Sequence, residues 1–187
     1  SKIVLENGLS LALANKETIV MAGDLIKELA YDKGAKIIPV DSEHSAIFCL
    51  TEKIGKENIS KIIITASGGP FRTLTKAQLE QVTVEQALNH PTWQMGKKIT
   101  VDSATLANKG LEVIEAAKLF DVGADKIEVI VHPQSLIHSL VRTKDGMLYA
   151  QISEPDMKHP ILNALTWPEN KENYLEDIFS AVDNLSC

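Results

Sequence analysis

Hydrophobic positions in the first third of the chain alternate between a helical and a strand-like pattern. Residues 18–33 carry apolar side chains at helical spacing and are followed by Gly34, so they predict an amphipathic helix. The next predicted elements are a buried strand at 37–40, a helix at 45–54 and a second buried strand at 62–65. This part of the chain therefore predicts helices and strands in succession.

The second half of the chain predicts a different arrangement. Residues 104–120 have the strongest helical pattern, and Ser103 or Thr105 is expected to cap that helix. Three strand-like runs follow at 127–131, 137–142 and 147–152, with a hairpin turn at 144–146 that indicates an antiparallel meander. The two halves together predict an α+β fold, with helices packed on a mixed or antiparallel sheet, and not a doubly wound sheet.

A long segment between these halves has little regular pattern. It contains Pro70, Pro91 and Gly96, and only short amphipathic pieces at 76–82 and 84–88. Such a segment is typical of a lid over a binding site. We therefore expect a lid at about 67–98.

Composition and charge narrow the class of protein. The 187 residues are 44% hydrophobic and 24% charged, as in an ordinary globular domain, and the net charge of −6 argues against a nucleic-acid partner. No apolar run is long enough to predict a membrane span, and no signal-like segment opens the chain, so we expect a cytoplasmic or plastid-stromal protein. Cys49 and Cys187 cannot make a disulfide framework and have no metal-ligand spacing.

Two carboxylates follow the first predicted buried strand. Asp41 and Glu43 lie two residues apart where the strand gives way to a helix, so their oxygens could converge on one cation. Acidic residues are also favourable in the first turn of a helix for electrostatic reasons. Taken alone, the pair is consistent with either role.

A second polar cluster surrounds the start of the strongest predicted helix. On a helix, Asn108 and Lys109 share a face with Glu112, because they precede it by four and three residues. Together with Ser103 they offer hydroxyl, amide and ammonium donors that suit a phosphate group. A capped helix with an exposed Lys–Glu pair would give the same pattern, although Gly110 inside the helix indicates close packing against a neighbour.

Three further features have both a functional and a structural interpretation. The turn at 67–70, with Ser67 and two glycines, is either an anion-binding loop or an ordinary turn, and it matches neither the dinucleotide fingerprint nor the P-loop. His90 and Trp93 could cover a polar substrate, or could be a surface histidine beside an anchoring tryptophan. We expect His132 and His138 to be structural, hydrogen-bonded histidines.

In their order along the chain, these motifs resemble the 1-deoxy-D-xylulose 5-phosphate reductoisomerases. The resemblance covers about residues 9–166, and several separate motifs in the right order are far more specific than any single glycine motif. The motifs are Leu13-Ala14-Asn15-Lys16-Glu17, Pro39-Val40-Asp41-Ser42-Glu43-His44-Ser45, Ser67-Gly68-Gly69-Pro70-Phe71-Arg72, His90-Pro91 with Trp93 and Met95-Gly96, the run 102–115, His132-Pro133-Gln134-Ser135, Ile137-His138-Ser139 and Pro155-Asp156-Met157.

The resemblance implies a reaction, cofactors and a set of site residues. The family converts 1-deoxy-D-xylulose 5-phosphate to 2-C-methyl-D-erythritol 4-phosphate in non-mevalonate isoprenoid synthesis, using a divalent metal (Mg²⁺ or Mn²⁺) and NADPH, and it forms homodimers. The metal acts as a Lewis acid during the carbon rearrangement that precedes reduction. By position, the implied metal ligands are Asp41, Glu43 and Glu112; the phosphate contacts are Ser67, Ser103, Asn108 and Lys109; further substrate contacts are Lys16 and Ser42; the lid residues are His90 and Trp93; and the NADPH contacts are Asn15, Glu17 and Gly96.

The sequence departs from the family pattern near both ends. It contains neither the glycine-rich dinucleotide fingerprint nor the helical domain that follows the linker. We therefore expect a central fragment, with 1–40 as the trailing helix and strand of an NADPH-binding domain, 41–166 as the catalytic domain and 167–187 as a linker. Such a chain should keep part of the metal and phosphate site without holding NADPH productively.

Two other functions remain open at this stage. A metal-dependent phosphosugar aldolase or isomerase without a reduction step would use the same carboxylates and phosphate donors. A non-catalytic oligomerisation or phosphosugar-binding module would keep the fold and the anion site but have no chemistry.

Overall fold

A computed structural model describes residues 1–169, so most of the expected linker at 167–187 lies outside the described residues. The helices are α1 (Lys2–Glu6), α2 (Lys16–Asp32), α3 (Ser42–Ile54), α4 (Lys76–Leu79), α5 (Val84–Leu88), α6 (Lys97–Ala104), α7 (Ala107–Phe120) and α8 (Lys158–Thr166), with 3₁₀ turns at Lys56–Asn58 and Ala124–Lys126. The strands are β1 (Leu11–Leu13), β2 (Ile37–Pro39), β3 (Ile59–Ala66), β4 (Ile127–Val131), β5 (Ile137–Thr143) and β6 (Leu148–Ile152). None of these described helices is long and apolar enough to span a bilayer.

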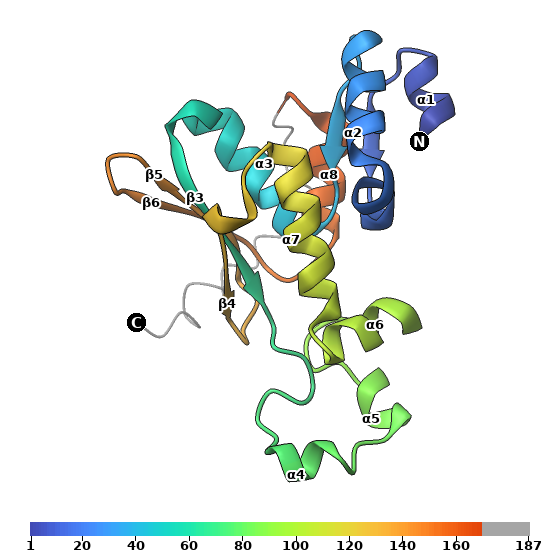
Figure 1. Cartoon of the computed structure of the whole chain (residues 1–187), viewed down its shortest axis with the longest axis vertical. Coiled ribbons are helices and arrows are strands. Elements are labelled where there is room, and N and C mark those ends of the chain that lie inside the picture. The colour runs from blue at the N-terminus through green and yellow to red at the C-terminus, as the bar shows by residue number, and fades with distance from the viewer. Residues whose placement is uncertain (170–187) are drawn as a thin grey trace.

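The larger sheet is mixed and has the strand order β4-β3-β5-β6. Strand β4 runs parallel to β3, whereas β5 is antiparallel to both of its neighbours. Helices α3 and α7 pack together on one face of this sheet (Figure 1). The fully buried side chains between them include Ile47 of α3, Ile62 and Ile64 of β3 and Ala116 of α7, so burial of this apolar face stabilises the arrangement.

The N-terminal residues form a smaller layer beside α7. Strands β1 and β2 pair in parallel, and α2 connects them and packs along α7. Gly23 of α2 allows this approach, because a Cβ at that position would lie 2.9 Å from the side chain of Lys118. The carboxyl ends of β1 and β2 therefore point toward the start of α3 and the middle of α7.

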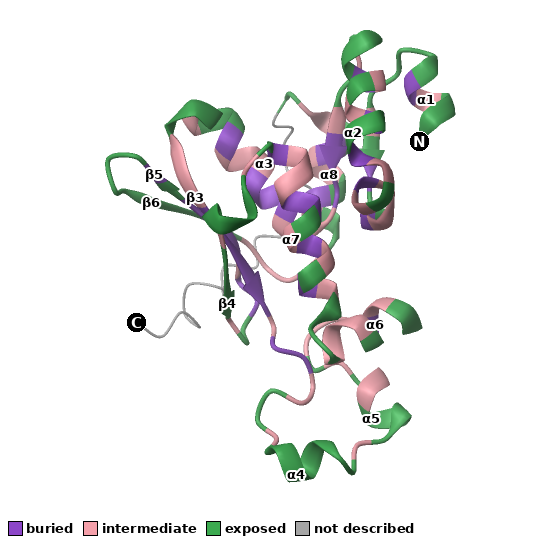
Figure 2. Ribbon diagram, in the orientation of Figure 1, coloured by how far each residue is buried: buried purple, intermediate pink, exposed green. Residues whose placement is uncertain are grey.

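The expected lid is an arm that extends away from both sheets (Figures 1 and 2). It contains α4 and α5, each with a capping box, and α6 then returns the chain to the body. Most residues of α4 and α5 are exposed, so the arm has little core of its own. The two short amphipathic pieces at 76–82 and 84–88 form helices, although α4 ends at Leu79.

Two sequence predictions about the strongest helix were wrong. The helix predicted at 104–120 is confirmed as α7, but it begins at Ala107, because Leu106 adopts a left-handed conformation with φ 61° after α6 ends at Ala104. Leu106 itself occupies the N-cap position of α7 without a side-chain cap, so Ser103 is not the cap, and Thr105 contributes only a 3.4 Å hydrogen bond from the amide of Ala107. Gly110 does not serve close packing, because nothing lies within 4 Å of where its Cβ would be.

The predicted meander was also wrong in its connectivity. Strand β3 lies between β4 and β5, so only β5 and β6 form the expected hairpin. The crossover that brings β4 parallel to β3 passes through α7, and such long-range pairing leaves no local signal. The mixed sheet with packed helices that defines the α+β class is confirmed.

Candidate metal and phosphate site

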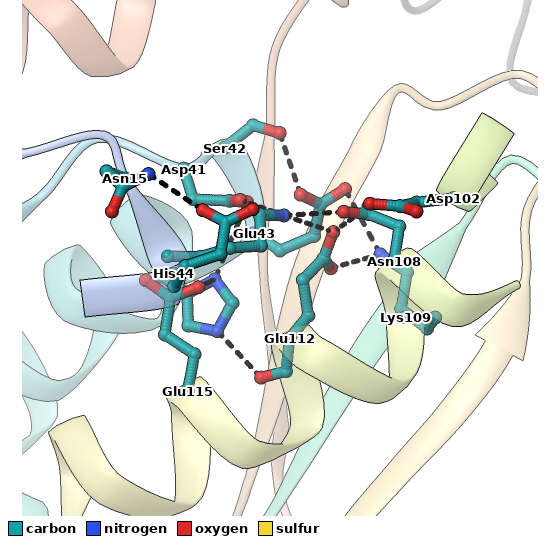
Figure 3. A network of polar contacts seen from close by, with 12 residues as sticks. Asn15, Asp41, Ser42, Glu43, His44, Asp102, Asn108, Lys109, Glu112 and Glu115 are labelled. Atoms are coloured by element: carbon teal, nitrogen blue, oxygen red, sulfur yellow. Dashed lines mark hydrogen bonds and ion pairs between the residues drawn. The ribbon is translucent and has the colours of Figure 1, made fainter. Parts of the chain in front are cut away.

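Four elements deliver the polar side chains of the site. Lys16 follows β1, Asp41 follows β2, Glu43 lies in the first turn of α3, and Glu112 lies in the middle of α7. Parallel strands place their carboxyl ends at the same edge, and this edge is where open α/β sheets bind ligands. The fold thus brings Glu112 of α7 next to Asp41 and Glu43, which are far from it in sequence (Figure 3).

Three carboxylates converge at this edge. Asp41, Glu43 and Glu112 each offer one oxygen, and these three oxygens lie within 4.8 Å of one another. Glu112 is 1% exposed, so its carboxylate is held in the protein interior. Hard carboxylate oxygens from several side chains are the ligands that Mg²⁺ and Mn²⁺ prefer, so the donor set fits a divalent cation of this class.

Two lysines balance the charge of the carboxylates. Lys16 Nζ lies 2.5 Å from Asp41 Oδ2 and 3.1 Å from Glu112 Oε1, and it donates a 2.8 Å hydrogen bond to Asn108 Oδ1. Lys109 Nζ pairs closely with Glu112 Oε2 and lies 3.6 Å from Glu43 Oε1. Two ammonium groups face three carboxylates, so the cluster has an excess of negative charge only when all three carboxylates are ionised.

The pKa values of these groups are perturbed in opposite directions. Burial opposes ionisation of Asp41, but the neighbouring His44, whose Nδ1 lies 3.5 Å from Asp41 Oδ1, and the charge of Lys16 hold its pKa well below the usual value. Burial raises the pKa of Glu43 to about 8, where attraction to Lys109 is offset by repulsion from Glu112 and Asp41. Crowded carboxylates that hold a proton at neutral pH are typical of a site that takes a metal in its place.

A second buried cluster lies behind the triad. His44 of α3 and Glu115 of α7 are 0% and 1% exposed, and with Asp41 they form another group whose ligand atoms lie within 4.8 Å. Burial would lower the pKa of His44, but the neighbouring carboxylates of Asp41 and Glu115 raise it to about 9. Burial raises the pKa of Glu115 to about 7, opposed by His44.

The loop after β3 forms the opposite wall. Ser67 Oγ lies 3.0 Å from His90 Nε2, and His90 Nδ1 accepts hydrogen bonds from the amides of Thr92 and Trp93 at 3.1 and 2.9 Å. Because Nδ1 accepts, Nε2 of the neutral ring carries the hydrogen and donates to Ser67. The Ser67 hydroxyl also accepts from the amide of Gly69 at 3.3 Å, so its own hydrogen remains free to donate to a ligand.

The walls enclose one cavity of about 220 Å³. Its lining includes every residue assigned from sequence to metal, phosphate, substrate or lid: Lys16, Asp41, Ser42, Glu43, Ser67, His90, Trp93, Ser103, Asn108, Lys109 and Glu112. Met95, Leu106 and Met157 contribute apolar lining that the assignments did not include. Carboxylates, ammonium groups and uncharged hydrogen-bond donors therefore line the same cavity.

The three residues assigned to NADPH lie outside this cavity. Asn15 caps α2 by accepting a hydrogen bond from the amide of Thr18, and it also donates to Glu17 at 2.8 Å. Glu17 pairs with Lys98 of α6, and Gly96 lines an adjoining hollow next to Trp93. Their roles stay predictions, although Asn15 and Glu17 follow β1 directly and Lys98, two residues after Gly96, pairs with Glu17.

Comparisons with known proteins bear directly on this arrangement. Residues 37–120 match the family model described as the 1-deoxy-D-xylulose 5-phosphate reductoisomerase C-terminal domain. The chain is 58% identical over 183 residues to the 1-deoxy-D-xylulose 5-phosphate reductoisomerase of Treponema denticola. The aligned region covers 97% of this chain and 48% of the Treponema denticola protein. The chain belongs to this reductoisomerase family.

Other reductoisomerases are similarly related to this chain in sequence and in fold, and the chain again covers less than half of each. The Clostridium tetani reductoisomerase is 57% identical over 93% of this chain and 45% of its own length, so the chain spans about half of the curated relatives it matches. A solved reductoisomerase in complex with NADPH, fosmidomycin and magnesium superposes with a TM-score of 0.85 at 44% identity, over 92% of this chain and 45% of that one. The Zymomonas mobilis reductoisomerase in complex with NADPH gives a TM-score of 0.84 at 47% identity, over 92% and 44%.

Two residues without an expected role, His44 and Glu115, are buried next to the triad by the reductoisomerase fold. Their spacing offered a usable signal, because His44 is three residues after Asp41 and Glu115 three residues after Glu112 on the same helix faces. His132 is a structural histidine as expected, since its Nε2 accepts from the amide of Leu136 at 3.2 Å. His138 is buried, with its ring 6.3 Å from that of Trp93.

Proposed function

We propose that this chain supplies the metal and phosphate site of an enzyme that converts 1-deoxy-D-xylulose 5-phosphate to 2-C-methyl-D-erythritol 4-phosphate, using a divalent metal and NADPH. The observation that supports this most is the carboxylate triad, whose oxygens lie within 4.8 Å of one another in the same cavity as the phosphate donors. Solved relatives are described as complexes with NADPH and magnesium. The proposal also places the protein in the cytoplasm or a plastid stroma.

In this proposal the carboxylates hold the metal and the basic residues hold the substrate. Asp41, Glu43 and Glu112 bind Mg²⁺ or Mn²⁺, which supplies Lewis acidity for the carbon rearrangement. Lys16 and Lys109 contact the same oxygens that a metal would use. When the metal neutralises those oxygens, the two ammonium groups become available to the anionic substrate.

The donors around α7 and the loop after β3 form the phosphate subsite. Asn108 and Lys109 lie in the first turn of α7, and Ser67 and Ser103 face them across the cavity. These side chains offer amide, ammonium and hydroxyl hydrogens, and the hydroxyl of Ser67 is already oriented by His90. Lys16 and Ser42 provide further substrate contacts, and the arm that carries His90 and Trp93 covers the bound substrate.

Reduction needs NADPH, which supplies a hydride when bound. Asn15 and Glu17 follow the parallel strand β1, the edge at which nucleotide cofactors bind in α/β sheets, and Gly96 lies beside the lid. We assign residues 1–40 to the trailing part of an NADPH-binding domain and 41–166 to the catalytic domain, and this division is supported by the two separate sheets.

A homodimer is part of the same proposal. The sheet leaves apolar side chains exposed on its outer strands, among them Ile130, Val131, Leu148 and Tyr149, each more than 40% exposed. A second copy of the chain would remove this apolar surface from water. Sedimentation of the full-length protein at micromolar concentration tests this part independently of the chemistry.

Calorimetric titration with Mn²⁺ tests the assignment of the metal site. We expect Mn²⁺ to bind the wild type, to bind more tightly when 1-deoxy-D-xylulose 5-phosphate is present, and to bind the Glu112→Gln variant weakly. Glu52→Gln, which neutralises an exposed carboxylate on α3, is the matched control and should bind as the wild type does. Equal Mn²⁺ affinity in the wild type and Glu112→Gln would refute the assignment. In the full-length protein, turnover of the sugar phosphate without NADPH would instead support an isomerase or aldolase.

A further inference from the structure

His44 lies between the carboxylate triad and a fourth buried carboxylate, that of Glu115 (Figure 3). The imidazole ring is stacked on Phe120 with an interplanar angle of 10° and a centroid separation of 6.4 Å, which fixes the plane of the ring. Its Nε2 donates a 2.9 Å hydrogen bond to the main-chain oxygen of Glu112. His44 thus contacts the backbone of Glu112 through Nε2, and its Nδ1 faces Asp41; both residues are proposed metal ligands.

The other ring nitrogen has two carboxylates as neighbours. His44 Nδ1 lies 3.5 Å from Asp41 Oδ1 and 3.5 Å from Glu115 Oε2. Among the described residues, neither Nδ1 nor Glu115 Oε2 has a hydrogen-bond partner of normal geometry, although both atoms are buried. Buried polar atoms without partners are costly, so their retention here needs an explanation.

Asp41 uses its two oxygens on opposite sides. Oδ2 faces Lys16 and the cavity, whereas Oδ1 faces His44. The side chain makes no capping hydrogen bond to α3, although Asp41 occupies the N-cap position of that helix. The rotamer of Asp41 is therefore held by His44 and Lys16 and not by the helix that follows it.

We propose that Glu115 is a positioning residue for the metal site. Through His44 it holds Asp41 so that the Oδ2 oxygen stays directed at the cation. The proposal rests on the proposed function, in which Asp41 and Glu112 bind a divalent metal. Metal-binding side chains commonly depend on such outer partners, whose loss weakens metal affinity about 10- to 100-fold.

A purely structural role for Glu115 would give a different pattern. Position 115 lies on the buried side of α7, where Ala116 and Phe120 are apolar. An apolar residue of similar size would fill this space without the cost of burying a carboxylate. A structural carboxylate would affect the unfolding temperature and leave the Mn²⁺ affinity of the folded protein unchanged.

The test compares Mn²⁺ binding in variants of the full-length protein. Glu115→Gln keeps the shape of the side chain and removes its charge, and we expect Mn²⁺ to bind this variant about 10- to 100-fold more weakly, measured by calorimetry and by electron paramagnetic resonance of free Mn²⁺. Glu52→Gln is again the matched control. His44→Gln keeps a donor for the main-chain oxygen of Glu112 but lacks the second ring nitrogen, so it should show a similar loss.

The double variant tests the route of the effect. If Glu115 acts through His44, Glu115→Gln combined with His44→Gln should bind Mn²⁺ no more weakly than the weaker single variant. Additive losses, or wild-type affinity in Glu115→Gln, would overturn the positioning role. If Glu115→Gln does not fold, His44→Gln still tests the proposal, because wild-type Mn²⁺ affinity in that variant would by itself overturn the positioning role. Two Mn²⁺ ions bound per wild-type chain would also overturn it, because the second cluster would then be a ligand set. Failure of the wild type to bind Mn²⁺ would refute the proposed function instead.

Discussion

Metal binding at the carboxylate triad should release the proton that Glu43 carries. Burial, with repulsion from Glu112 and Asp41, raises the pKa of Glu43 to about 8, despite the attraction of Lys109. Below that pH the side chain holds a proton that a cation must displace, so the affinity for Mg²⁺ should rise with pH and level off above pH 8. For a single proton with this pKa, the apparent dissociation constant falls about 30-fold between pH 6.5 and pH 9.

Calorimetry in buffers of different ionisation enthalpy measures this coupling directly. Mg²⁺ binding should release about 0.9 proton from Glu43 at pH 7 and about 0.1 proton at pH 9. Glu43→Gln binds Mg²⁺ more weakly, and it should also lose this pH-dependent release, whereas Glu52→Gln should keep it. Other groups contribute a background that all variants share. Proton release that is equal at both pH values, or unchanged in Glu43→Gln, would refute the argument.

Three further predictions concern the backbone, the lid and the core. Gly69→Ala should destabilise the protein by about 1–2 kcal/mol or more in urea denaturation, because Gly69 has φ +68° and an added Cβ would lie 2.8 Å from a main-chain oxygen of α6. Gly110→Ala, in open space inside α7, should stabilise the protein by about 0.5–1 kcal/mol. A Gly69→Ala variant more stable than Gly110→Ala would contradict both predictions. His90→Ala removes the hydrogen-bond donor to Ser67, so the sugar phosphate should bind several-fold more weakly in calorimetry, whereas the Mn²⁺ affinity should stay constant. A parallel loss of Mn²⁺ affinity would show that the lid also shapes the metal site. Ile64→Ala, at a fully buried position of β3, should cost about 2–5 kcal/mol of unfolding free energy, and a cost below about 1 kcal/mol would place Ile64 outside the main core.

Local pattern was enough to predict most elements and to mark Asp41, Glu43 and Glu112 as candidate functional residues, whereas their proposed role as metal ligands came from the family resemblance. Asp41 and Glu43 were recognised because a strand-to-helix junction has a clear signature, and Glu112 because helical spacing places it beside Lys109. Neither signature shows that the two groups meet. That required the packing of α2 and α3 against α7, and the family resemblance supplied it in advance.

The errors have a common physical origin in tertiary structure. Leu106 carries no local signal for a left-handed conformation, which costs a leucine energy that the surrounding packing must supply. The position of β3 between β4 and β5 depends on contacts between residues far apart in sequence. His44 and Glu115 were missed because a polar residue within a helix is usually solvated, and only the fold shows that both are buried.

Helix α7 gives the site a fixed internal length. Lys109, a proposed phosphate donor, and Glu112, a proposed metal ligand, are three residues apart on one hydrogen-bonded helix, which corresponds to about 4.5 Å along its axis. A loop could adjust this spacing, but a helix with Glu112 and Glu115 buried in the core cannot stretch. If the proposed roles of Lys109 and Glu112 hold, a phosphorylated ligand with one additional carbon between its phosphate and its chelating oxygens would fit this fixed spacing less well, so the helix itself would select substrates by length.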